Sequence, residues 1–232
     1  MKLEQFFYGG DNLGYLLYTD KLAAAIDGGA VDEILDFTRQ HDLRLAWATN
    51  THAHGDHTTG TQRLVAASGA EYLDHHNYTE GQSIDLDGES VTVRLTPGHT
   101  MDSVSFAADD FLVTGDTLFN ATVGNCFSGD LKAFYRSIQK LIRYPGTTRI
   151  YAGHDYVKAS LAYARLLTPD NKAIDAYAAR YNKTHVVSTL DEELTVNPFL
   201  RFNDPAIIDV LKAQKLPVKT EYQRWESIMS IE

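Results

Sequence analysis

Thr51-His52-Ala53-His54-Gly55-Asp56-His57 places three imidazoles and a carboxylate shortly after an apolar run, Leu43–Thr49, that predicts a strand. Loops at strand ends commonly bind ligands. Burying so many polar side chains without partners would cost roughly 1–3 kcal/mol for each group. Zinc, iron and manganese all accept imidazole and carboxylate ligands. This segment therefore predicts a metal site and argues against a solvated polar loop.

Three more ligand-type side chains, those of His99, Asp116 and His154, each follow a predicted strand. The strands are predicted at Val91–Leu95, Phe111–Thr114 and Arg149–Ala152. A single histidine at a strand end is more often a surface or packed residue than a ligand. Together with the first segment, however, the three form an ordered set that predicts one shared metal centre.

The remaining pattern predicts a strand-rich α/β domain followed by a helical one. Further strands are expected at Leu13–Tyr18, Ala23–Ile26 and Val104–Ala107, with helices at Val31–His41 and Leu131–Ile142. Asp130 is a suitable N-cap for the second helix. After Tyr156 the strand signal fades, and helices are expected at Val157–Leu167, Lys172–Tyr181, Pro205–Ala213 and Glu221–Met229. We therefore expect a catalytic domain at 1–154 and a helical substrate-binding domain at 155–232.

Composition narrows the class of protein. The 232 residues carry a formal net charge of -10, which disfavours nucleic acid as a partner. No apolar run approaches the ~20 residues that span a bilayer, and the N-terminal segment lacks the features of a signal peptide. The single cysteine, Cys126, excludes an intrachain disulfide and fits a reducing compartment. The expectation is a cytoplasmic protein without a membrane partner, with a monomer as the default for an oligomeric state that the sequence leaves open.

Beyond the metal motif, several segments carry a resemblance to a known family. They are Gly115-Asp116-Thr117-Leu118-Phe119, Gly153-His154-Asp155-Tyr156, Ser188-Thr189-Leu190-Asp191-Glu192-Glu193 and Asn197-Pro198-Phe199-Leu200-Arg201. The chain resembles the metallo-β-lactamase superfamily and, within it, the glyoxalase II (hydroxyacylglutathione hydrolase) family. This resemblance implies a four-layer αββα sandwich with a small C-terminal helical domain that helps to wall the substrate site.

The resemblance also implies a pair of divalent metal ions, with zinc the first choice and iron or manganese the alternatives. It assigns His52, His54 and His99 to one ion, assigns Asp56, His57 and His154 to the other, and makes Asp116 the bridge. Hydroxide held by the metals would attack the carbonyl of a small-molecule thioester, with Asp56 and Asp116 as catalytic residues. Asp27 and Asp102 are candidate partners of the ligating imidazoles, although each equally suits a turn or an N-cap.

The sequence departs from the family at the side chains that hold glutathione. The resemblance places Asn125 at a lysine position, Phe127 at a tyrosine position, Gln223 at an arginine position and Glu226 at a second lysine position, whereas Tyr156 is kept and Arg224 is a possible substitute. Because a hydrogen bond to a charged group contributes roughly 1.5–3 kcal/mol, losing two or three would weaken binding by at least ~10²-fold. We therefore predict a carrier thiol less anionic than glutathione, or poor use of glutathione.

Other functions remain open at this point. A persulfide dioxygenase uses a single iron, a lactonase or β-lactamase shares the superfamily, and a non-catalytic metal-binding module is the non-enzymatic alternative.

Structural roles are predicted for the other residues that could carry chemistry: His75 and His76 in a solvated turn, His41 and His185 on the surface, Tyr177, Tyr181 and Trp225 in the core, and Cys126 as a small loop residue.

Overall fold

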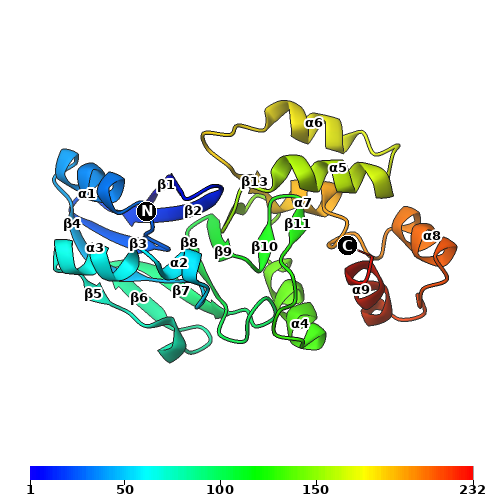
Figure 1. The fold of residues 1–232 in the computed structure, drawn as a ribbon, viewed down its shortest axis with the longest axis horizontal. Helices are drawn as coiled ribbons and strands as arrows, with labels where there is room; N and C mark the ends of the chain where they lie inside the picture. Colours follow the sequence, from blue (N-terminus) through cyan, green and yellow to red (C-terminus); the bar gives the residue numbers. More distant parts are fainter. Residues whose placement is uncertain (232) are drawn as a thin grey trace.

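Two β-sheets stack against each other and carry helices on their outer surfaces in the computed structural model, which describes residues 1–231 (Figure 1). The first sheet has the order β1 (Lys2–Tyr8), β2 (Asn12–Tyr18), β3 (Leu22–Ile26), β4 (Arg44–Thr49), β5 (Glu71–Tyr72). The second has the order β13 (Ser188–Thr189), β12 (Arg149–Ala152), β9 (Phe111–Gly115), β8 (Val104–Ala108), β7 (Glu89–Leu95), β6 (Ser83–Leu86). A separate hairpin joins β10 (Leu118–Phe119) to β11 (Thr122–Val123).

Every second side chain along the strands points between the two sheets, and these side chains form the core. In β2, Leu13, Tyr15 and Leu17 belong to this core, whereas Leu16 belongs to the cluster on the outer face of the sheet. Successive side chains of a strand point to opposite faces, so a strand with both faces covered is apolar throughout. β2 and β3 are buried along almost their whole length for this reason.

Helices cover both outer faces. Helices α1 (Val31–Gln40) and α3 (Thr61–Ser68) pack on the first sheet, where Ala23 and Ala25 leave room for their side chains. Helix α4 (Leu131–Leu141) packs on the second sheet through Phe134 and Ile138. The layers therefore run helix, sheet, sheet, helix, which confirms the predicted αββα architecture.

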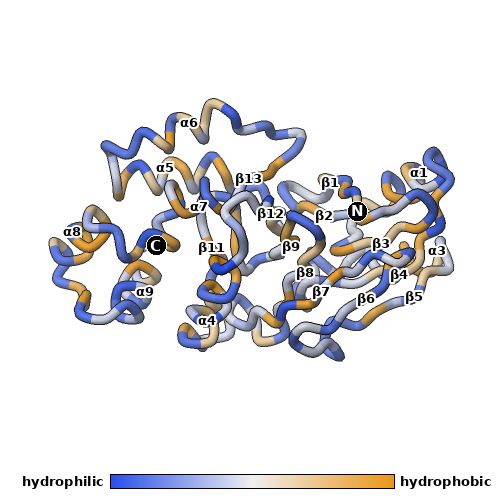
Figure 2. Tube along the Cα trace, turned by 180° about the vertical axis from the view of Figure 1, so that it is seen from behind, coloured by the Kyte–Doolittle hydropathy of each residue, from blue (hydrophilic) through white to orange (hydrophobic). Residues whose placement is uncertain are grey.

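The C-terminal segment is mostly helical, as predicted. It contains α5 (Val157–Leu167), α6 (Ala173–Arg180), α7 (Leu190–Val196), α8 (Pro205–Ala213) and α9 (Glu221–Met229). Figure 2 shows apolar and polar residues alternating along α8 and α9, as expected for helices with one buried face. Strand β13, which the sequence did not indicate, pairs antiparallel with β12 and ties this segment to the second sheet.

The segment from Ser188 to Arg201 supports the small hairpin β10–β11. Thr189 and Glu192 form a capping box at the start of α7. The buried carboxyl group of Glu193 accepts a hydrogen bond from the backbone N–H of Ala121, 2.8 Å away. The side-chain amide of Asn197 donates to the carbonyl of Thr122 over 2.9 Å. Helix α7 therefore holds the hairpin in place.

Most predicted elements are present with ends shifted by at most one or two residues, and four of them (Arg149–Ala152, Val157–Leu167, Pro205–Ala213, Glu221–Met229) match without any shift. The core roles of Trp225 and Tyr177 and the surface positions of His41 and His185 are confirmed. The core role of Tyr181 is wrong in part, because this residue is half-buried and its hydroxyl donates to Asp155 Oδ2 over 2.5 Å.

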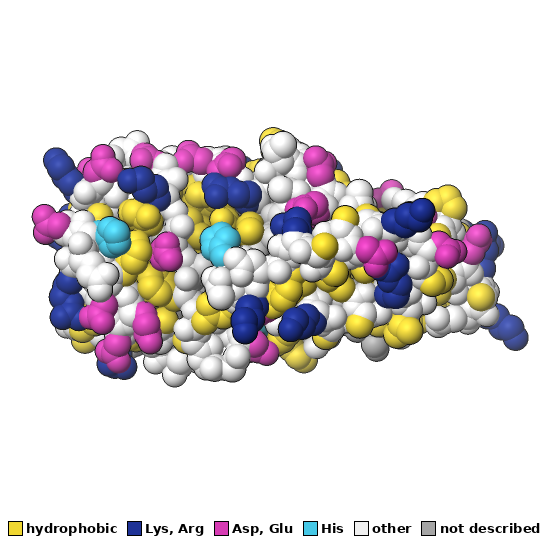
Figure 3. Space-filling view, turned by 90° about the horizontal axis from the view of Figure 1, so that it is seen from above, with side chains coloured by type: hydrophobic (Ala, Val, Ile, Leu, Met, Phe, Trp, Pro, Cys, Tyr) yellow, Lys and Arg dark blue, Asp and Glu magenta, His cyan; other side chains and the backbone are white. Residues whose placement is uncertain are grey.

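Charged side chains of both signs are mixed on the face seen in Figure 3. In the view of Figure 3, lysine and arginine side chains lie among aspartate and glutamate side chains and form no continuous basic patch. Among the described residues, no helix combines the length and the apolar character needed to cross a membrane.

Candidate metal centre

The predicted ligands meet at one edge of the two sheets because each follows the end of a strand. The loop after β4 carries His52 and His54 and continues into the short helix α2 (Gly55–Thr58), which holds Asp56 and His57. The turns after β7, β9 and β12 carry the other three, which are His99, Asp116 and His154. The structure therefore brings together all seven side chains that the sequence singled out.

Asp116 lies at the middle of the cluster. Its Oδ2 atom is 3.4 Å from His99 Nε2 and 3.5 Å from His154 Nε2, and its Oδ1 atom is 3.3 Å from His57 Nε2. His52 Nε2 is 3.8 Å from Oδ2. One carboxylate thus faces imidazoles from both predicted metal positions, as a bridging ligand must.

The ligand atoms fall into two groups suited to metal binding. One group contains His52, His54, His99 and Asp116, and the other contains Asp56, His57 and His154; within each group the ligand atoms lie within 4.8 Å of one another. His54 and Asp56 are the more exposed members, and the other five are buried. This division agrees with the assignment that the resemblance implied.

Hydrogen bonds on the side away from the centre fix which ring nitrogen of each buried imidazole faces the centre. His57 Nδ1 is 2.9 Å from Asp27 Oδ2, and His154 Nδ1 is 3.0 Å from Asp11 Oδ1. His99 Nδ1 donates to the carbonyl of Asn125 over 2.9 Å. Because carboxylates and carbonyls only accept, each Nδ1 must carry a proton, and Nε2 is the nitrogen that faces the centre and can ligate a metal ion there.

His52 is fixed in the same way through a hydroxyl group. Thr51 Oγ1 donates to Asp27 Oδ2 over 2.7 Å, so its lone pair accepts the Nδ1 proton of His52, which is 3.0 Å away. The Nε2 atom of His52 therefore also presents a lone pair to the centre.

This arrangement of lone pairs suits a cation. His57 Nε2 and His154 Nε2 lie 3.2 Å apart, and His99 Nε2 lies 3.0 Å from His54 Nδ1. Two nitrogen lone pairs at such distances repel each other unless a proton or a metal ion lies between them. Asp116 Oδ1 is also buried without a hydrogen-bond partner. The residues present therefore fit bound metal ions.

Electrostatics agree with this interpretation. Burial, followed by the field of His57, lowers the pKa of His52 to about 3, so this imidazole is neutral and free to ligate. Burial acts to lower the pKa of His57, but the charges of Asp27 and Asp116 and the hydrogen bond to Asp27 raise that pKa to about 11. The surroundings of His57 Nε2 thus favour a positive charge, which a proton or a metal ion can supply.

Gly153 allows the last ligand to approach the others. A Cβ atom on this residue would collide with Asp116 Oδ1 and would lie 2.8 Å from His57 Cε1. Only glycine fits the turn that brings His154 to the cluster.

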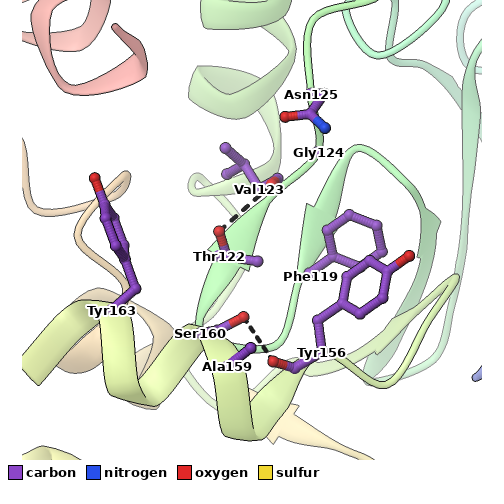
Figure 4. A pocket seen from close by; sticks show the side chains of 9 residues that line it. All are labelled: Phe119, Thr122, Val123, Gly124, Asn125, Tyr156, Ala159, Ser160 and Tyr163. Atoms are coloured by element: carbon purple, nitrogen blue, oxygen red, sulfur yellow. Dashed lines mark hydrogen bonds between the residues drawn. The ribbon is translucent and has the colours of Figure 1, made fainter. Parts of the chain in front are cut away.

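A cavity of about 300 Å³ opens beside the cluster (Figure 4). None of its lining residues carries a charge; they are Phe119, Thr122, Val123, Gly124, Asn125, Tyr156, Ala159, Ser160 and Tyr163. The hairpin β10–β11 forms one wall and helix α5 forms the other (Figure 4). Its size is at the lower end of the range for small-molecule pockets.

Two lining residues connect this cavity to the ligand cluster. The ring of Tyr156 stacks on that of His154, with centroids 5.0 Å apart and planes 3° apart. The backbone carbonyl of Asn125 accepts the hydrogen bond of His99. Phe127, which the sequence also placed here, is 66% exposed and stands against the rings of His54 and His99 at 5.7 and 5.2 Å.

The three predicted substrate residues of α9 are not among those that line this cavity. Arg224 donates from Nε to Asn203 Oδ1 over 2.8 Å and from Nη1 to the carbonyl of Val218 over 3.0 Å. Gln223 belongs to the capping box of α9, and Glu226 Oε1 accepts from the hydroxyl of Tyr222. The structure therefore places Asn125, Tyr156 and Phe127 beside the centre, whereas Arg224, Gln223 and Glu226 have hydrogen-bond partners within the C-terminal segment.

Several hydrogen-bond partners of the ligands could not be found from the sequence, and one was assigned to the wrong histidine. Asp11, Asn12 and Thr51 were not singled out, although Asn12 donates to Asp56 Oδ2 over 2.9 Å. Asp27 pairs with an imidazole of the centre as expected, but Asp102 pairs with His75 over 2.8 Å. The prediction of a solvated turn is wrong for His75, which is 3% exposed because this pair draws it inward.

Similarity to solved structures agrees with the observed architecture. ETHE1 from Myxococcus xanthus matches with a TM-score of 0.74 at 23% identity, covering 100% of this chain and 91% of that one. A metallo-β-lactamase from Staphylococcus aureus matches with a TM-score of 0.69 at 19% identity, covering 100% of this chain and 71% of that one. At these identities the likeness shows the metallo-β-lactamase fold alone.

Curated relatives are more similar in sequence. The hydroxyacylglutathione hydrolase of Pseudoalteromonas translucida is 32% identical over 95% of this chain and 93% of its own length. That of Anaeromyxobacter dehalogenans is 37% identical over 86% of each chain. The family model described as the hydroxyacylglutathione hydrolase C-terminus matches residues 155–227, the region predicted here as the second domain. By this similarity along nearly its whole length, the chain belongs to the hydroxyacylglutathione hydrolase family.

Proposed function

We propose that this chain hydrolyses a small-molecule thioester at a centre of two divalent metal ions, with zinc as the first choice and iron or manganese as alternatives. The observation that carries the proposal is the convergence of five imidazoles and two carboxylates into two adjoining groups. His52, His54 and His99 would hold one ion, and Asp56, His57 and His154 the other, with Asp116 shared. Metal-dependent thioester hydrolysis is also the activity expected of the chain's family.

When bound, such ions lower the pKa of coordinated water and polarise a carbonyl group. The protein's own contribution is to orient the ligand side chains before a metal ion binds. Asp27 and Asp11 orient the rings of His57 and His154, so Nε2 of both imidazoles faces the centre without reorganisation. Asn12 holds the exposed carboxylate of Asp56, which otherwise would lose rotamer freedom on binding a metal.

The cavity beside the centre supports a role for residues 155–232 as a substrate-binding domain. Tyr156, Ser160 and Tyr163 reach it from α5, opposite the hairpin that α7 supports (Figure 4). Partial burial, followed by the charges of nearby carboxylates, raises the pKa of Tyr156 to about 12, so its hydroxyl is a neutral hydrogen-bond donor at physiological pH. These contacts support a thioester substrate in which the part that enters the cavity is uncharged.

Charge is the property that separates glutathione from other carriers at this site. Glutathione carries carboxylates, and none of the residues that line the cavity has a positive charge with which to form an ion pair. We therefore propose that the preferred carrier thiol is less anionic than glutathione. The sequence supports this independently, since Asn125 and Phe127 stand where the resemblance implies a lysine and a tyrosine.

The test compares kcat/KM for S-D-lactoylglutathione and for a neutral thioester, such as one of N-acetylcysteamine, in the metal-loaded protein. We expect the neutral ester to be preferred. Asn125→Lys should raise kcat/KM for the glutathione ester by about ten-fold or more, as one charge-assisted contact contributes roughly 1.5–3 kcal/mol. Asn125→Gln is the matched control without charge. A wild-type protein that clearly prefers the glutathione ester would refute the proposed carrier, and hydrolysis of neither ester would argue against the thioesterase itself.

A single-iron persulfide dioxygenase is the competing enzyme. The second group of ligands, Asp56, His57 and His154, is complete here, which favours the two-metal hydrolase. Iron stoichiometry and oxygen uptake with a persulfide substrate distinguish the two activities.

A further inference from the structure

A second cluster of metal-ligand side chains lies outside the centre described above. It occupies the short 3₁₀ turn η1 (His75–Asn77) and the residue before it, Asp74. One ligand atom from each of Asp74, His75 and His76 lies within 4.8 Å of the others. The carboxylate of Asp102, from the loop before β8, reaches the same two imidazoles.

His75 is the member that points to a ligand. Its side chain is only 2% exposed, and its Nε2 atom lies 2.8 Å from Asp102 Oδ2. Because a carboxylate accepts, Nε2 carries the ring proton and Nδ1 carries a lone pair. This Nδ1 atom is buried and has no hydrogen-bond partner. A hydrogen bond between His75 and Asp102 alone does not account for this unpartnered nitrogen.

Two more ligand atoms lie around that lone pair. Asp74 Oδ1 is 3.7 Å from His75 Nδ1 and 2.8 Å from His76 Nδ1. With metal–nitrogen and metal–oxygen bonds of about 2.0–2.2 Å, ligand atoms of a tetrahedral zinc site lie roughly 3.3–3.6 Å apart. The two distances to Asp74 Oδ1 lie on either side of that range, and the three ligand atoms of the cluster lie within 4.8 Å of one another, so small rotations of Asp74 and His76 suffice to close the site.

The cluster has the same construction as the main centre. There, Asp27 and Asp11 hold the outer nitrogens of His57 and His154 while the inner nitrogens face the other ligands. Here, Asp102 holds the outer nitrogen of His75. A carboxylate behind a metal-binding histidine orients the ring and raises its basicity.

We propose that Asp74, His75 and His76 form a separate site for one divalent transition-metal ion of the zinc class, with Asp102 positioning His75. Three protein ligands leave at least one coordination position open. The side chains of His76 and Asp74 are 54% and 40% exposed, and a cavity of about 200 Å³ lined by His75, His76, Met101 and Asp102 adjoins them. The ion is therefore exchangeable from solution, and water occupies its open position.

The experiment measures bound zinc in the holoprotein, with the main centre loaded, after equilibrium dialysis against micromolar zinc. Wild-type protein should hold one equivalent more than His76→Gln, because His76 is half-exposed and its loss removes only this site. Asp102→Asn should weaken the additional zinc by about 10–100-fold. The matched control, His185→Gln, replaces another exposed histidine and should keep the wild-type zinc content.

Thioester hydrolysis by each variant reports separately on the main centre and should equal that of the wild type in His76→Gln and His185→Gln. Equal zinc content in the wild type and His76→Gln overturns the proposal, as does additional zinc that His185→Gln also removes. Either result would leave Asp74 with His76, and Asp102 with His75, as hydrogen-bonded pairs with a structural role alone.

Discussion

Asp27 Oδ2 lies 2.9 Å from His57 Nδ1, and neither side chain is exposed beyond 1%. The same carboxylate accepts hydrogen bonds from the backbone N–H and the hydroxyl of Thr51, at 2.8 and 2.7 Å. One buried charge therefore orients His57 directly and His52 through Thr51. Because these imidazoles belong to different ligand groups, Asp27 acts on both.

We expect Asp27→Asn to weaken metal binding by about 10–100-fold, the usual effect of losing the acceptor behind a ligating histidine. Asparagine tolerates the positive φ of 53° at this position, so backbone strain does not confuse the result. Metal content after dialysis against a graded series of chelator concentrations measures the change. Asp11→Asn is the comparison: it should affect only the ion held by His154, so a loss of both ions there would contradict this division of roles.

Removing the metal should abolish hydrolysis and lower thermal stability together. Without a metal ion, only a proton can occupy the space between His57 Nε2 and His154 Nε2, which lie 3.2 Å apart, and the folded state loses the free energy of ligand binding. A melting curve and a thioester assay, before and after treatment with a chelator and after addition of zinc, test both effects. Full activity in a demonstrably metal-free sample would refute the proposed chemistry.

Gly153→Ala should lower metal content and activity sharply while leaving the strands intact. The added methyl group would overlap Asp116 Oδ1 and crowd His57, so the two ligand groups must separate. Gly81→Ala is a suitable control because nothing lies near its Cβ position, although its φ of 78° costs some stability. Wild-type metal content in Gly153→Ala would show that the turn carrying His154 can shift freely.

The ligands could be predicted from the sequence because each comes after an apolar run that marks the end of a strand. Their outer partners could not. Asp11 lies in an ordinary Gly-Asp-Asn turn, 143 residues from the His154 ring that it contacts. Only the stacking of the two sheets brings these residues together. For Asp102 the prediction was wrong in the opposite direction. Asp102 lies three residues after His99 in the sequence, but its carboxylate pairs with His75 instead of with an imidazole of the metal centre.

The fold shows the same limit. Long periodic segments such as Leu131–Leu141 were found from their spacing, whereas the two-residue strand β13 was not. So short a strand has no periodicity of its own and exists because β12 offers a free edge and helix α7 anchors the chain directly after the strand. The four-layer order came from the resemblance, and the apolar patterns on both faces of β2 and β3 now explain it.

Tyr156 should affect substrate binding through its ring more than through its hydroxyl. The ring stacks on His154 and lies 5.2 Å from that of Phe119, on the wall of the cavity. We expect Tyr156→Ala to raise KM for a neutral thioester about ten-fold and Tyr156→Phe to change it much less, since only the first loses the apolar surface. Steady-state kinetics on both variants test this, and an equal effect of the two would assign the contact to the hydroxyl.

Glu193 gives the fold a dependence on pH that can be separated from the metal centre. It is completely buried, and burial raises its pKa to about 7 despite hydrogen bonds from the Ala121 N–H, Asn197 and Tyr177. The folded protein therefore binds a proton more tightly than the unfolded chain does. The stabilisation is complete below the ordinary pKa of about 4.5 and is lost as the pH rises to about 7.

Glu193→Gln should remove this dependence, because glutamine can accept from Ala121 and Asn197 with its oxygen and donate to the Tyr177 hydroxyl. One pKa unit corresponds to about 1.4 kcal/mol, so the wild type should lose about 3 kcal/mol relative to the variant between pH 4.5 and 7. Urea unfolding at several pH values measures the difference, and Glu71→Gln, at an exposed position, controls for loss of a carboxyl group alone. Parallel pH profiles for the wild type and Glu193→Gln would mean that the Glu193 carboxyl group stays ionised within the fold, held by its three donors.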